Sequence, residues 1–112
     1  MSFPGVCSGL VEIAGGGVAT VVPPGSGGFL MVTIVDPAYS QAHHSGLLAF
    51  DACPSPGLIS LTIGTVIANA DVAAPGALTG EASRSNIAVD ATGIHIKNRT
   101  GDSRVYSYTL IG

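Results

Sequence analysis

Glycine and proline divide this chain into short apolar segments, and this division limits the possible folds more than any other feature. The 112 residues include 16 glycines and 7 prolines, so 23 positions disfavour the interior of a helix. The segments between them are rich in valine, isoleucine and threonine, which favour strands. No window of twelve residues has the helical period, which excludes a parallel α/β fold with crossover helices. We therefore expect an all-β protein.

The spacing of the breaks predicts about eight or nine short strands at intervals of roughly ten residues. Such spacing is typical of an antiparallel β-sandwich, a jelly roll or a small barrel. The near-continuous apolar run 29–35 is predicted to be buried on both faces, and Gly64 to mark a bulge within one long strand. The predicted strands are 6–14, 18–22, 29–35, 46–52, 58–68, a short edge strand at 77–81, 87–91, 93–98 and 104–111.

The last twenty residues carry the clearest pattern. A strand at 93–98, a polar turn at 99–103 and a second strand at 104–111 predict a hairpin that ends the chain. In its first strand Ile94 and Ile96 share one face, which is expected to face the core.

The second strand of this segment is apolar on both faces. Tyr106, Tyr108 and Leu110 share one face, and Val105 and Ile111 lie on the other. A strand of this kind is expected to be buried twice, once inside the domain and once against a neighbouring subunit. We therefore expect Tyr106, Tyr108 and Leu110 to form a subunit interface.

The composition supports burial by partner subunits. The length fits one domain over residues 1–112. Hydrophobic residues make up 46% of the chain, but only 10% are charged, against about 25% in an average soluble chain. A surface with so few charges is poorly protected against association.

The charge pattern points away from nucleic acid and membrane. The net charge is −3, whereas phosphate binding needs clustered lysine and arginine. Lys97, Arg99 and Arg104 fall within eight residues, and we interpret them as the solvated tip of a turn. The alternative is an exposed contact turn at Arg99 and Arg104 that binds a partner, a phosphate or an acidic glycan. No segment resembles a secretory signal or a membrane span.

No catalytic, metal or cofactor site is expected. His43, His44, His95 and Asp51 lack the spacing of a ligand set, because adjacent residues of an extended chain point to opposite faces. There is no nucleophile elbow, and the glycine clusters lack the lysine of a phosphate loop.

Two further motifs are weak. Cys7 and Cys53 are too few for a disulfide framework, and reduced thiols in a reducing compartment are favoured over a disulfide. Asn98-Arg99-Thr100 matches a glycosylation sequon, which has meaning only in a secreted protein.

The closing segment resembles the terminal hairpin of small structural proteins of tailed bacteriophages and gene transfer agents. The resemblance rests on Gly93-Ile94-His95-Ile96-Lys97-Asn98-Arg99-Thr100-Gly101 and on the strand from Arg104 through Leu110. It implies a β-sandwich or jelly-roll virion protein, most simply a head-spike or fibre-base subunit. Such a subunit forms a trimer or pentamer, joins other virion proteins, and is assembled in the host cytoplasm. No catalytic residues come with the resemblance.

Two alternatives remain open at this point. A lectin-like carbohydrate-binding module would use Tyr106, Tyr108 and the loop around His43 and His44 to bind a host glycan. A jelly-roll metal enzyme, with His43, His44 and His95 as its first candidates, is the least supported.

Overall fold

The computed structural model describes residues 5–23, 25, 27–35, 45–51, 57–63, 67–72 and 84–112, with backbone alone for 58–63 and 67–72. These residues form strands and turns and no helix, which confirms the all-β class for the described part of the chain. The strands are β1 (Val6–Ile13), β2 (Val18–Val21), β3 (Gly27–Ile34), β4 (Ser45–Asp51), β5 (Gly57–Ile63), β6 (Ile67–Val72), β7 (Ser85–Asp90), β8 (Gly93–Asn98) and β9 (Arg104–Ile111).

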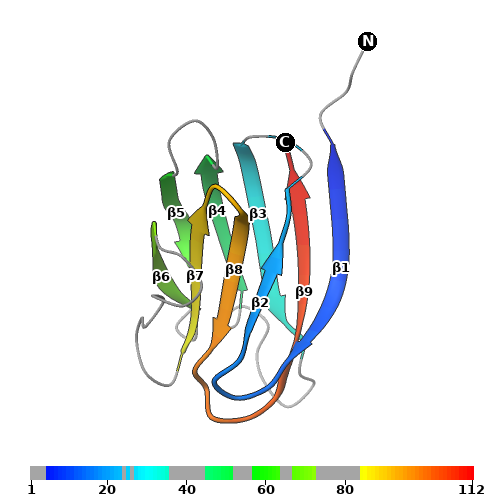
Figure 1. Cartoon of the computed structure of the whole chain (residues 1–112), viewed down its shortest axis with the longest axis vertical. Coiled ribbons are helices and arrows are strands. Elements are labelled where there is room, and N and C mark those ends of the chain that lie inside the picture. The colour runs from blue at the N-terminus through cyan, green and yellow to red at the C-terminus, as the bar shows by residue number, and fades with distance from the viewer. Residues whose placement is uncertain are drawn as a thin grey trace.

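The strands form two sheets that lie face to face (Figure 1). The first sheet has the order β1-β9-β3-β4-β5, and the second has the order β2-β8-β7-β6. All neighbouring strands run antiparallel except β6 and β7, which are parallel. The two ends of the described chain lie together, because Gly5 and Gly112 exchange backbone hydrogen bonds of 3.3 and 3.0 Å.

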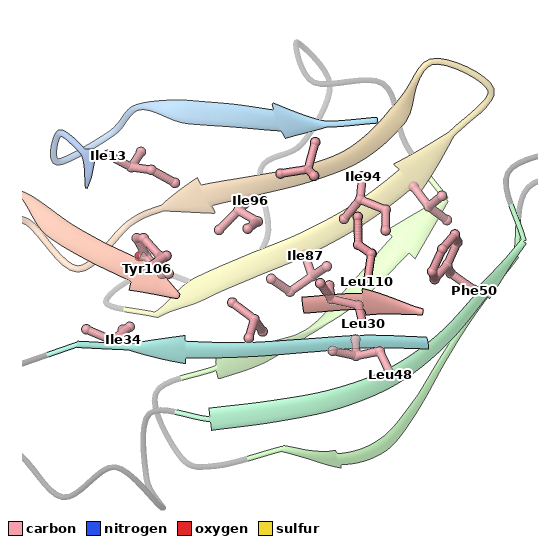
Figure 2. Packing of buried hydrophobic residues seen from close by; sticks show 13 residues of the cluster. Ile13, Leu30, Ile34, Leu48, Phe50, Ile87, Ile94, Ile96, Tyr106 and Leu110 are labelled. Carbon is pink, nitrogen blue, oxygen red and sulfur yellow. The ribbon is translucent and has the colours of Figure 1, made fainter. Parts of the chain in front are cut away.

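The core fills the space between the sheets (Figure 2). Seven strands contribute described side chains to it, from both sheets. Apolar side chains of this size each stabilise the fold by about 1.5 to 3 kcal/mol when they leave water. The core members are Ile13, Val21, Leu30, Val32, Ile34, Leu48, Phe50, Ile87, Val89, Ile94, Ile96, Tyr106 and Leu110.

Strand β3 is buried on one face only, so the prediction that 29–35 is buried on both faces is wrong. Leu30, Val32 and Ile34 face the core, whereas Phe29 and Met31 are 47% and 49% exposed. The apolar run hides the alternation, because both faces carry large apolar residues and only one meets the second sheet.

The two strands of the C-terminal segment have the predicted bounds, but they do not form a hairpin. β8 pairs with β2 and β7, and β9 pairs with β1 and β3. The turn at 99–103 therefore carries the chain from one sheet to the other. Strand bounds follow from local residue preference, whereas the choice of sheet depends on distant partners. We call this connection the C-terminal arch.

The C-terminal arch is fastened to the turn between β1 and β2 by Asn98. Its side-chain amide donates to the carbonyls of Ile13 (2.8 Å) and Asp102 (2.7 Å), and its Oδ1 accepts from the Thr100 backbone N–H (3.0 Å) and hydroxyl (2.7 Å). The Asn98 backbone also exchanges bonds with Gly16 and Gly17. All four hydrogen-bonding positions of a buried amide are thus satisfied.

The predicted strand 58–68 is two strands in different sheets, so that prediction is wrong as well. β5 pairs with β4 in the first sheet, and β6 pairs with β7 in the second. Gly64 and the predicted edge strand 77–81 lie outside the described residues.

Candidate functional site

The first sheet turns a set of large apolar side chains toward solvent. We call the outward-facing side chains of β1, β9, β3 and β4, together with Val35, the outer face. Antiparallel pairing places Val6, Ile111 and Phe29 in one row across three strands, and Met31 lies in the next row beside Thr109. Its exposed large apolar residues are Val6, Leu10, Phe29, Met31, Val35 and Ile111.

Charges are sparse on the outer face. Among its described residues, Glu12 lies near one end and Asp51 at the other. Large apolar surfaces that are exposed on a soluble protein usually mark a contact, so this face is the best candidate for a contact with another chain.

The three residues predicted to form a subunit interface lie on the opposite side of β9. Tyr106 and Leu110 are fully buried between the sheets, so they contact the second sheet rather than a partner subunit. Tyr106 donates to or accepts from the Ser85 hydroxyl at 2.6 Å, and burial raises the pKa of its phenol. The half-buried Tyr108 ring packs against the core over Gly9, where a Cβ would lie 2.6 Å from its hydroxyl oxygen. The strand face was predicted correctly as apolar, but the side that meets solvent is the other one.

The predicted contact turn lies at the C-terminal arch. Arg99 and Arg104 are half-buried, and the Arg104 Nε donates to the Thr100 hydroxyl at 3.2 Å. Arg104 also lies 3.7 Å from the carboxylate of the exposed Asp102. The Arg99 backbone N–H donates to the Arg84 carbonyl at 3.0 Å, which brings the start of β7 to the arch. All four lysine and arginine residues of the chain therefore lie close to the C-terminal arch, near the start of β7, the end of β8 and the start of β9. They are Arg84, Lys97, Arg99 and Arg104.

A buried histidine joins three elements of the second sheet. The imidazole of His95 has no exposed surface; its Nδ1 lies 2.9 Å from the Thr20 hydroxyl and its Nε2 lies 2.8 Å from the Asp90 carboxylate. An ionised carboxylate only accepts hydrogen bonds, so Nε2 donates to Asp90, and in the neutral ring Nδ1 accepts from Thr20. The contacts connect β2, β8 and the last residue of β7.

Asp90 is the most perturbed acid of the described residues. Its carboxylate accepts hydrogen bonds from the Thr92 hydroxyl (2.5 Å) and backbone N–H (2.9 Å), and from His95. The Thr92 hydroxyl and then His95 lower the pKa of Asp90 from 3.8 to about 2. The Asp90 carboxylate is therefore ionised at neutral and mildly acidic pH.

The described residues contain no group of three or more histidine, cysteine or acidic side chains that could hold a metal ion. Both ring nitrogens of His95 are engaged within its own cluster. His43, His44 and Cys53 lie outside the described residues, and Cys7 is half-buried on β1.

The sequence analysis did not predict the hydrogen bonds of Asn98, nor those that join Thr20, His95 and Asp90. Asn98 and Thr100 are two residues apart in the sequence, a spacing at which an asparagine side chain often bonds to the backbone in a turn, so this contact could have been predicted. The distant partners Ile13 and Thr20 leave no local signal.

Comparisons with protein-family models, curated proteins and solved structures found no match. Within the described part of the chain, no helix has the length and hydropathy needed to cross a membrane.

Proposed function

We propose that this protein is a structural subunit that associates with copies of itself through the outer face, as a component of a phage or phage-like particle. One observation carries the self-association: six large apolar residues are exposed on one sheet, with charges only near the ends of the described surface. Covering such residues gains about 25 cal/mol for each Å² of apolar surface removed from water. The particle assignment, as a head-spike or fibre-base subunit of threefold or fivefold order, draws on the resemblance of the closing segment.

We also propose that the two sheets form a β-sandwich of the jelly-roll type. β5 and β6 are counted among its eight or nine strands. The jelly-roll type is supported by the course of the two termini: β1 lies beside β9 in one sheet, and β2 lies beside β8 in the other. An antiparallel ribbon wrapped over both sheets produces this pairing. The neighbouring β3, β4 and β5 instead follow one another as in a meander.

A glycan site at Tyr106 and Tyr108 receives no comparable support from the structure. Aromatic side chains that bind sugars must expose a ring face. Tyr106 is fully buried and Tyr108 packs against the core, while His43 and His44 lie outside the described residues.

The test of self-association is the native mass of the purified chain and of two lysine variants. Met31→Lys places a charge in the middle of the outer face, and we expect it to lower the native mass while the folded spectrum is kept. Val22→Lys is the matched control, because Val22 is an exposed apolar residue at the end of β2, away from the outer face. An unchanged assembly of Met31→Lys would reject the outer face as the contact.

The particle assignment has a separate test. If it is correct, the chain sediments with purified particles of its source and is recovered from them in fixed stoichiometry. Recovery only in the soluble fraction would reject the particle while leaving the self-association in place.

A further inference from the structure

Strand β1 is an open edge of the first sheet. The sheet order places it at one end, with β9 on one side and no described strand paired on the other (Figure 1). It has eight residues, whereas the edge strand β2 of the second sheet has four.

The ladder between β1 and β9 shows which backbone groups face this open edge. Gly5 and Gly112 exchange both hydrogen bonds, and the register continues as Val6 opposite Ile111. Bonded and non-bonded pairs alternate in an antiparallel ladder. The N–H and C=O groups of Val6, Ser8, Leu10 and Glu12 therefore point away from β9, toward the open edge.

The side chains of the same residues leave the edge unprotected. Val6 and Leu10 are 67% and 70% exposed, among the most exposed large apolar residues of the described chain. Edge strands usually carry lysine, proline or a bulge that prevents pairing with another chain. β1 has none of these, its pairing with β9 is continuous, and its single charge is Glu12 near its end.

We propose that β1 pairs antiparallel with β1 of a second copy, about a twofold axis at Ser8. This inference rests on the proposed self-association and adds a second contact to it, at the edge of the first sheet and separate from the contact through the outer face. Val6 of each copy then lies opposite Leu10 of the other, Ser8 lies opposite its own copy, and Glu12 lies beyond the paired apolar residues. Pairing about Gly9 is disfavoured, because it would place the charged Glu12 opposite the apolar Val6. The two first sheets become one continuous sheet with one continuous outer face.

The contact is isologous, because each copy offers the same strand to the other. Assemblies that contain it have an even number of copies, so a ring of three or five subunits would occur in pairs. The native mass therefore also reports on this contact.

Disulfide trapping tests the register. In a background with Cys7→Ser and Cys53→Ser, Ser8→Cys should form a covalent dimer on mild oxidation. Directly opposed residues of a bonded pair have Cα atoms about 5.5 Å apart, within the range of a disulfide. Glu12→Cys is the control, since its two copies would be far apart. Efficient trapping through Glu12→Cys but not through Ser8→Cys would overturn the register.

A backbone variant tests the pairing itself. Ser8→Pro removes an N–H that points to the open edge and leaves the bonds to β9, and proline is tolerated on such an edge. We expect the dissociation constant of the pair to rise about tenfold or more, and Ser8→Ala, which keeps the N–H, to leave it unchanged. If Ser8→Pro assembles normally while Met31→Lys does not, the β1 pairing is rejected and the proposed function stands. A monomeric parent chain rejects both.

Discussion

The two faces of strand β3 have similar composition and different surroundings. Leu30 and Val32 on one side are buried against the second sheet, while Phe29 and Met31 on the other are about half exposed. The comparison teaches that hydrophobicity alone does not identify a core. The inner face is covered by the second sheet of the same chain, whereas the large apolar residues of the outer face are exposed.

The largest expected effect comes from a charge on the inner face. Leu110→Asp buries an unpaired carboxylate between the sheets, which costs several kcal/mol and should prevent folding. Thr109→Asp, on the half-exposed side of the same strand, is the control and should fold. Circular dichroism of the two purified variants checks this, and a folded Leu110→Asp would show that the inner face is misassigned.

The next effect tests whether the C-terminal arch holds the two sheets in place. Asn98→Ala leaves the Ile13 and Asp102 carbonyls and the Thr100 N–H without the partner that they have now. We expect a loss of about 2 to 4 kcal/mol in the free energy of unfolding. Asn98→Asp keeps the shape and removes the two donors, so it should also destabilise. Urea unfolding measures both, and wild-type stability in either variant would argue against this role.

A smaller effect concerns the second sheet and depends on pH. The folded pKa of Asp90, about 2, lies below its ordinary value of 3.8, so its stabilisation is present above about 3.8 and is lost as the pH falls through about 2. Asp90→Asn should therefore unfold at lower urea than the parent near neutral pH, with the difference shrinking toward pH 2. Asp102→Asn, at a carboxylate that is 80% exposed, should show little difference. If the difference in stability between Asp90→Asn and the parent stayed constant with pH, the stabilising role of the ionised Asp90 carboxylate would be contradicted.

The smallest effect on stability is expected on the outer face. Met31→Lys should change the free energy of unfolding of a single chain by no more than about 0.5 kcal/mol, as for most exposed positions. Leu30→Lys, one residue earlier and fully buried, should be strongly destabilised. Thermal unfolding at a concentration where the chain is dissociated compares the two, and equal losses would remove the distinction between the faces.

The sequence predicted the local structure better than the partners of each strand. The bounds of β8 and β9 were predicted, because glycine, the polar turn and the alternating apolar residues are local signals. Their assignment to different sheets was not, because it depends on pairing with strands that are distant in the sequence, such as β2 for β8 and β1 for β9. A five-residue polar turn fits a hairpin and an arch equally well.

The sequence directed attention to strand β9, but the structure buries the predicted face and exposes the other one. The shortage of charge led us to expect a contact with partner subunits, which stays a prediction. The apolar residues that are exposed on the first sheet include Ile111 of β9. Tyr106 and Leu110 were predicted to lie at an interface because their strand is apolar on both faces, but apolar residues on a strand are equally suited to the core. Which face of an apolar strand meets the other sheet depends on the whole fold.

The native mass of the unmodified chain at low micromolar concentration tests the central claim most directly. Covering of the outer face by other copies predicts a mass of at least two chains of 11.1 kDa. A single 11.1 kDa species that persists at high concentration would contradict it.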